Sequence, residues 1–225
     1  DAQGLDVTAA GQLEPRVRTW YNPERRSSDF LIPGLMVVII MVVALQQTAV
    51  SLVREREQGT DEQLAISPMK RWEMMVGKVA PWTLLAFLDL AVITAVGIWF
   101  FDLPLRGSVT VLMLGAALFV FCALGLGLVI SAVAPSLETA NMLGLLLSLL
   151  PAFILSGFAF PLGSIPEWLQ VISCAFPARF MVTISRGVFL KGAGFDELWP
   201  QLAALGAYAV VVLAIAVLLD GRRRR

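Results

Sequence analysis

Five long apolar runs dominate the chain and are separated by short polar stretches. The runs cover residues 30–53, 79–101, 108–133, 139–160 and 198–219. Four of them contain no Asp, Glu, Lys or Arg, and the second contains a single acid, Asp89. A helix needs about 20 mostly apolar residues to cross about 30 Å of hydrocarbon, where every backbone polar group must be bonded within the segment. The pattern therefore predicts an all-α polytopic membrane protein with five transmembrane helices.

The basic residues between the runs indicate how these helices are oriented. Four consecutive arginines, residues 222–225, follow the last run, and such clusters are held on the cytoplasmic side of a membrane. With alternating helices the loop 54–78 falls on the same side, and its basic residues agree: Arg54, Arg56, Lys70, Arg71 and Lys78. We expect a transmembrane domain over 30–220, a cytoplasmic basic tail over 221–225 and an external segment over 1–29.

An external amino terminus without an export signal is physically awkward. Residues 1–29 are polar and lack a basic segment followed by a short apolar core, so they do not form a signal peptide. We expect a further, upstream transmembrane helix in the intact protein, which would make six. Residues 1–29 would then end an external domain between the first two helices.

Composition supports the membrane class and excludes several kinds of chemistry. Hydrophobic residues make up 58% of the chain and charged residues 15%, against about a quarter charged in soluble domains. The absence of histidine excludes Ser-His-Asp and Cys-His nucleophiles and histidine metal sites. Cys122 and Cys174 lack CxxC spacing, so neither a metal site nor a disulfide is expected. The formal net charge of zero does not indicate nucleic acid as a partner.

The loop 54–78 is the most informative polar segment. Residues 54–57 extend the first run as a charged turn, and Gly59 is suited to stop that helix. Thr60 with Gln63 resembles a capping box, and Ser67 with Pro68 is typical of a second helix start. The spacing of Met69, Trp72, Met75 and Val76 predicts a short amphipathic helix in the membrane plane. The loop is either a plain interfacial connector or a contact for a cytoplasmic protein, and its mixed charge favours the second.

Three stretches of the chain resemble the ABC-2 type transport permeases. The loop block matches that family's cytoplasmic loop at Arg54, Glu55, Glu57, Gly59, Thr60, Glu62, Gln63, Leu64, Ser67, Pro68, Gly77 and Lys78. Residues 16–28 (RVRTWYNPERRSS) resemble the run that ends the outer domain of the drug-efflux branch, and residues 160–192 resemble the outer segment before the last helix. The family's first transmembrane helix has no counterpart here.

The resemblance implies a membrane subunit of an ABC exporter in a bacterial inner membrane. The loop 54–78 would form the coupling element for a separate ABC ATPase, with the first ten matched positions as contacts. This chain lacks a Gly-x-x-x-x-Gly-Lys-Ser/Thr loop, so we expect the partner to use ATP and Mg²⁺, and no cofactor to bind here. The resemblance also implies a homo- or heterodimer of permease subunits that exports drugs or other amphiphiles.

Polar residues within the runs are candidates for a translocation pathway. An ionised Asp89 near mid-membrane costs about 2.5–3.5 kcal/mol, so it should face the bundle or a wet cavity. The other candidates are Gln46, Gln47, Asn141, Ser148 and Pro151, the last of which could also break its helix. For each of them, a hydrogen bond or contact between helices is the alternative. The small residues Ala123, Gly127 and Ser131 share one face and predict close helix packing.

The segment 161–191 is too polar and proline-rich to cross the membrane. Its pattern predicts two short helices that dip into the outer leaflet, the first with Trp168 at headgroup level and the second with Arg179 and Arg186. We interpret these three residues as part of an outer gate.

Other functions fit the sequence less well. An intramembrane protease of the serine or metal type lacks histidine, and an aspartyl type needs a second embedded acid. A secondary transporter usually shows internal repeats and several embedded charges, and neither is visible in this sequence. A membrane anchor for a complex stays open, as does the transported substrate.

Overall fold

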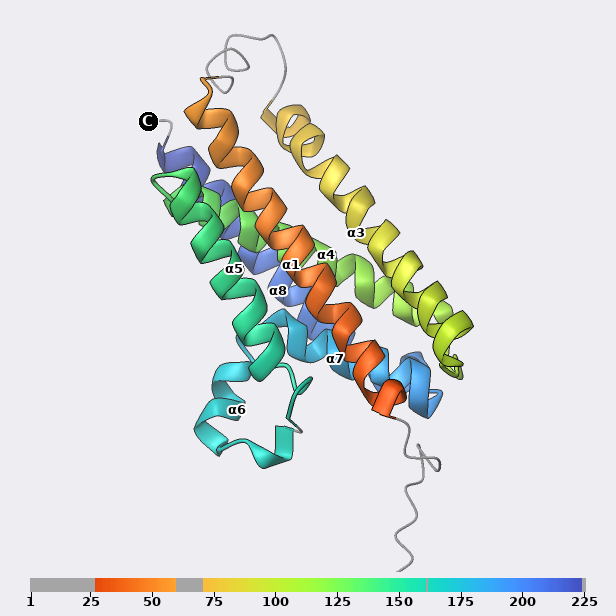
Figure 1. The fold of residues 1–225 in the computed structure, drawn as a ribbon. Coiled ribbons are helices and arrows are strands. Elements are labelled where there is room, and N and C mark those ends of the chain that lie inside the picture. Colours follow the sequence, from red (N-terminus) through yellow and green to blue (C-terminus); the bar gives the residue numbers. More distant parts are fainter. Residues whose placement is uncertain (1–26, 60–70, 161, 224–225) are drawn as a thin grey trace, which may run out of the picture.

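The computed structural model describes residues 27–59, 71–160 and 162–223, and all regular structure in that part of the chain is helical (Figure 1). The prediction of an all-α polytopic membrane protein is confirmed. The long helices are α1 (Ser27–Glu57), α3 (Arg71–Phe101), α4 (Val109–Val133), α5 (Leu137–Ile154) and α8 (Phe195–Arg223). Shorter elements lie between α5 and α8: η2 (Leu162–Ser164), α6 (Glu167–Ser173), α7 (Pro177–Arg186) and the π-helical η3 (Gly187–Lys191).

Five helices in the described residues are long and apolar enough to cross a membrane, as predicted. Their apolar portions are Phe30–Glu57, Val76–Phe101, Val109–Val133, Leu137–Ile154 and Phe195–Leu219. The fourth differs from its predicted range of 139–160, because it begins at Leu137 and ends at Ile154. The Ser156 hydroxyl donates to the Ala152 carbonyl and accepts from the Phe158 amide, and Gly157 has a φ of 85°, so the chain turns there. Pro151 lies inside the helix rather than breaking it.

The ends of the loop 54–78 belong to the two helices that it joins. Residues 54–57 form the last turn of α1, and Gly59 follows with a φ of 71°, as predicted for a helix stop. Residues 71–78 do not belong to a separate short helix but form the first two turns of α3, because nothing between them and the apolar run interrupts the helical pattern. Residues 60–70 lie outside the described part of the chain.

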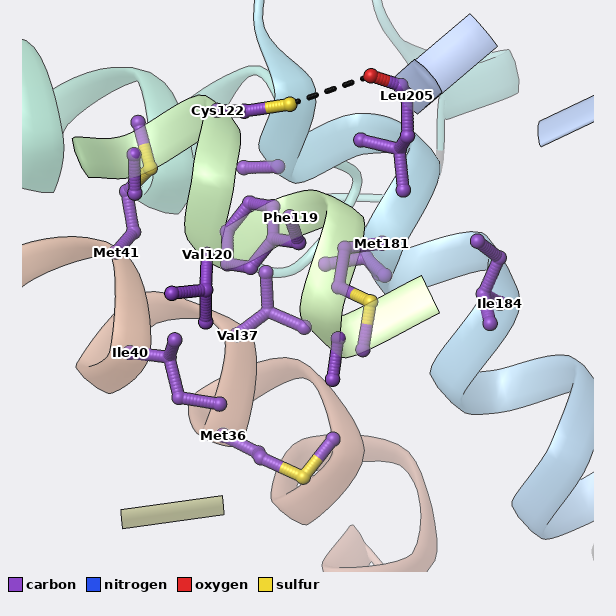
Figure 2. Close-up of a cluster of buried hydrophobic side chains, with 14 of the residues drawn as sticks. Met36, Val37, Ile40, Met41, Phe119, Val120, Cys122, Met181, Ile184 and Leu205 are labelled. Atoms are coloured by element: carbon purple, nitrogen blue, oxygen red, sulfur yellow. Dashed lines mark hydrogen bonds between the residues drawn. The ribbon is translucent and has the colours of Figure 1, made fainter. Parts of the chain in front are cut away.

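The helix α1 is the central element of the bundle and packs against α3, α4, α5 and α7 (Figure 1). A buried apolar cluster joins these helices. Figure 2 shows Met36, Val37, Ile40 and Met41 of α1 against Phe119 and Val120 of α4, with Met181 and Ile184 of α7 nearby. The Cys122 thiol donates to the Leu205 carbonyl of α8 at 3.4 Å. Inside a bilayer, dense packing of this kind, rather than the release of water, holds helices together.

Small residues allow a close crossing between α1 and α4. A Cβ atom added to Gly127 would lie 2.6 Å from the Leu45 carbonyl oxygen and 2.8 Å from the Thr48 Cβ. Ala123 and Ser131, one turn to either side, are buried. The predicted small-residue face is confirmed.

The bundle has two ends with different characters (Figure 1). At one, the end of α1, the start of α3, the turn from α4 to α5 and the end of α8 lie together; we call it the charged end. The other end holds the start of α1, with α7 packed against α1, and α6 below the end of α5; we call it the α6–α7 end. The pair formed by α6 and residues 177–191 is bent by 92°. Because α5 ends and α8 begins at this end, the pair enters and leaves on one side, as predicted for re-entrant half-helices.

A candidate coupling site at the charged end

Three consecutive side chains at the end of α1 contact three different parts of the molecule. They are Glu55, Arg56 and Glu57. Successive residues of a helix point about 100° apart, so three of them fan around more than half of the helix axis. Because α1 is central, one turn reaches α3, α4 and α5. We call this arrangement the three-way contact.

Glu55 forms an ion pair with Lys78 of α3. The carboxylate oxygen Oε2 lies 2.6 Å from Nζ, and the two side chains keep only 28% and 15% of their exposure. Partial burial limits screening by solvent, so this pair contributes more than an exposed one. The two residues lie near the two ends of the loop 54–78, so the pair joins the end of α1 to the first part of α3.

Arg56 reaches the last turn of α4. Its Nη2 donates to the Ser131 carbonyl, and its Nε donates to the Leu52 carbonyl of its own helix at 3.4 Å. The carbonyls of a final turn carry partial negative charge, which a guanidinium neutralises. Arg56 therefore joins the end of α1 to the end of α4.

Glu57 contacts the first residue of α5. Its Oε1 accepts a hydrogen bond from the Leu137 amide at 2.7 Å. A carboxylate at a helix N-terminus is favoured by the helix dipole and satisfies an amide that has no partner within the helix. The Ser136 side chain accepts from the Thr139 amide at 3.2 Å and completes the cap.

The geometry changes the interpretation of the matched loop residues. Glu55 and Glu57 contact this chain itself, while Arg54 on the same turn is exposed. The predicted contacts Thr60, Glu62, Gln63, Leu64, Ser67 and Pro68 lie outside the described residues. The sequence pattern did not reveal the role of Arg56, whose partner is a backbone carbonyl 75 positions away.

The predicted pathway residues of α1 and α5 meet at one helix contact. The Gln46 Nε2 donates to the Asn141 Oδ1 at 2.6 Å, and a Cβ atom on Gly144 would lie 3.4 Å from the Gln46 Cα. Ser148 and Pro151 are buried, and the Ser148 hydroxyl donates to the Leu145 carbonyl of its own helix. This face of α5 therefore packs on α1, with Asn141 at its exposed margin.

Two other pathway candidates lie apart from that contact. Gln47 is exposed on α1. Asp89 of α3 is half-buried, and within the described residues its buried Oδ2 atom has no hydrogen-bond partner. An apolar groove of about 310 Å³ between α3 and α4 is lined by Phe87, Leu90, Thr94, Trp99 and Leu112 among others, and Asp89 does not line it.

The three predicted gate residues do not come together at one point. The two arginines instead make contacts at two different places in the α6–α7 end. Arg179 donates through Nη1 to the Gln170 carbonyl and the Ser173 hydroxyl, both at 2.6 Å, across the bend. Arg186 donates to the Gly157 and Phe158 carbonyls at 2.9 and 3.3 Å. It also lies 3.7 Å from the centre of the Phe30 ring, which makes a cation–π contact with the start of α1. Trp168 is exposed on α6.

Comparison with known proteins places these features in a family. Residues 6–218 match the family model described as ABC-2 family transporter protein. The chain is 33% identical over 186 residues to the "Probable multidrug ABC transporter permease YbhR" of Escherichia coli K12, covering 83% of this chain and 50% of that protein. It is 31% identical over 211 residues to the "Probable multidrug ABC transporter permease YbhS", covering 94% and 56%. It is 33% identical over 213 residues to the "Inner membrane transport permease YhhJ", covering 92% and 54%.

The chain spans about half the length of these curated relatives. The match itself extends over nearly all of the chain, and the five membrane-crossing helices and the re-entrant pair lie within it apart from the last residues of α8. The chain belongs to the ABC-2 transporter family.

Proposed function

We propose that this chain is the permease part of an ABC exporter whose charged end receives the movement of a separate ABC ATPase. The observation that carries the proposal is the three-way contact, which ties the start of the matched loop to three membrane helices. The ATPase would supply ATP and Mg²⁺ chemistry, because the chain itself has no phosphate-binding Gly-Lys-Ser/Thr loop.

The membrane and the cargo follow from the relatives' names and from charge. Two relatives are named multidrug permeases and a third an inner membrane permease, which favours an amphiphilic drug-like substrate and the bacterial inner membrane. The arginines at 222–225 favour a cytoplasmic charged end and an external α6–α7 end. The exposed apolar faces of α3, α5 and α8 meet lipid and leave surface for a second permease subunit.

The test uses the full-length protein expressed together with a candidate partner ABC ATPase. A stoichiometric complex after purification and vanadate-sensitive uptake of ethidium into inside-out vesicles are the expected results. Ethidium uptake that persists in vanadate but stops when the proton gradient is dissipated would show a secondary transporter and contradict the proposal. A complex without nucleotide-dependent movement of any amphiphile would leave the chain as a membrane anchor.

A further inference from the structure

We propose that the three-way contact moves the ends of α1, α3, α4 and α5 as one rigid unit, so that Glu55, Arg56 and Glu57 transmit movement rather than bind the ATPase. This inference rests on the proposed function, because it concerns how a movement that begins in the loop reaches the membrane helices. Within that function it divides the matched loop residues into two groups. One group faces the partner, and the other holds the permease together.

The first support is that two of the three contacts are made at the end of a neighbouring helix. Ser131 lies in the last turn of α4, and Leu137 is the first residue of α5. A helix is hydrogen-bonded along its whole length, so a displacement imposed on its end moves the entire element. Contacts at these points are therefore better placed for transmission than contacts in the middle of a helix.

The second support is that the charges match at every contact. A carboxylate meets an ammonium group at Glu55, a guanidinium meets carbonyls at Arg56, and a carboxylate meets an amide at Glu57. Hydrogen bonds with one charged partner are shorter and stronger than neutral ones. Each of the three consecutive residues of α1 therefore carries the charge opposite to that of the group it meets.

The third support is an apolar layer directly beneath these contacts. Val53, Ala134 and Ala140 form a buried cluster, and Leu137 packs against it. The cluster joins the end of α1 to the turn between α4 and α5. The polar contacts therefore sit on a packed base, and the unit resists shear as well as separation.

The fourth support is the exposure of the side chains that an ATPase would contact at the charged end. Arg54 is exposed on the turn that carries the three-way contact, whereas Glu55 and Arg56 are half-buried. An ATPase approaching the charged end would meet Arg54 before it could meet the half-buried Glu55; Glu57 is exposed, but its carboxylate is held by the Leu137 amide. Substitution of Arg54 should therefore weaken ATPase association, and substitution of Glu57 should not.

The first experiment measures the distance from α1 to α5 in the full-length permease bound to its ATPase. Spin labels are placed at Gln58 and Met142, both exposed, after Cys122 and Cys174 are changed to serine. In the otherwise unchanged protein we expect the same distance without nucleotide and after trapping with ATP and vanadate. In Glu57→Ala the distance should shift by several ångströms on trapping, with the ATPase still copurifying. Glu138→Gln, an exposed acid in the first turn of α5, is the matched control and should behave as the parent does.

The second experiment exchanges the two charges of the ion pair. With labels at Gln58 and Leu84, Glu55→Lys and Lys78→Glu should each broaden the α1–α3 distance distribution. The double variant restores opposite charges and should return it to the parental width. A docking role for Glu55 predicts no such recovery, because the reversed charge would still face the ATPase.

Each outcome decides between the alternatives. If the ATPase binds but the parental α1–α5 distance changes on trapping, or if Glu57→Ala releases the ATPase, the rigid-unit inference is wrong while the proposed function stands. If no ATPase copurifies with the unmodified permease, the proposed function fails and this inference fails with it.

Discussion

Single residues determine how closely the helices approach and how their ends are held. Gly127 allows the α4 backbone to lie against the Leu45 carbonyl of α1. The charged side chains act at helix ends, where unpaired carbonyls and amides are available. In this protein most arginine contacts described above therefore have a backbone carbonyl as acceptor, rather than an acidic side chain.

Substitution of Gly127 by alanine should destabilise the bundle. The added methyl group would lie 2.6 Å from a backbone oxygen, so α1 and α4 must separate, at a cost of about 1–3 kcal/mol. Thermal unfolding in detergent measures the effect. Gly206→Ala in α8, where nothing lies within 4 Å, is the control and should be neutral or slightly stabilising. Equal melting temperatures for the two variants would contradict the predicted clash.

Replacement of Arg186 by lysine should impair export without releasing the ATPase. An ammonium group cannot reach the Gly157 and Phe158 carbonyls in the same geometry as the guanidinium while covering the Phe30 ring. We expect vanadate-sensitive ethidium transport to fall at least about tenfold, the scale of one lost hydrogen bond to a charged group. The amount of copurified ATPase is the control. Unchanged transport would show that the Arg186 contacts at the α6–α7 end are not needed for export.

At the scale of the elements, α5 is the most informative helix. Its 18 residues span about 27 Å, close to the minimum for crossing a membrane. It is capped at one end by Ser136 and Glu57 and is followed by the turn at Gly157. Its small and polar face lies on α1 through Gly144 and Ser148, and the hydrogen bond from Gln46 to Asn141 adds a polar contact between the two helices.

The hydrogen bond between Gln46 and Asn141 should show measurable coupling. A cycle of Gln46→Leu, Asn141→Leu and the double variant should give an interaction energy of about 0.6 kcal/mol, and no more than about 1.7 kcal/mol, from unfolding in detergent. Gln47→Leu, at the exposed neighbouring position, provides the control and should change stability little. Additive single effects would show that the two amides do not interact. A changed range of transported amphiphiles in the same variants would support the pathway interpretation as well.

Sequence patterns located the elements well but their ends less well. The apolar runs predicted every long helix, since burial in lipid imposes length and composition on a span. The end of α5 at Ile154 rather than residue 160 depends on hydrogen bonds of Ser156, which hydropathy does not detect. Residues 71–78 show an amphipathic pattern, but nothing in that pattern determines whether they form a separate helix or the start of α3.

At the scale of the whole molecule, the two ends of the bundle differ in the elements that they bring together. The ends of α1, α3, α4, α5 and α8 lie together at the charged end, and the bent pair lies at the α6–α7 end (Figure 1). In the proposed function, movement enters at the charged end and opens or closes the α6–α7 end. The two natural cysteines offer a direct test, because Cys174 is exposed at the α6–α7 end and Cys122 is buried in the core.

Intact cells should show labelling of Cys174 by a membrane-impermeant maleimide. The expected result is modification of the parent and of Cys122→Ser, and loss of that modification in Cys174→Ser. The reason is that the proposed orientation places the α6–α7 end outside, while the Cys122 thiol is enclosed and donates to the Leu205 carbonyl. Labelling of Cys174 only after the cells are opened would reverse the orientation and move the ATPase site to the other end.

The sequence by itself determined the class of protein, the number of long helices in the part of the chain that the structure describes, and the family resemblance. These properties depend on length, hydropathy and local motifs, which are written along the chain. Only the tertiary structure decided the partners of Glu55, Arg56 and Glu57, because those partners include backbone atoms about 75–80 positions away and lie on helices whose rotation no local pattern specifies. Whether a polar residue such as Gln46 lies in a pathway or at a helix contact depends in the same way on which face packs inward.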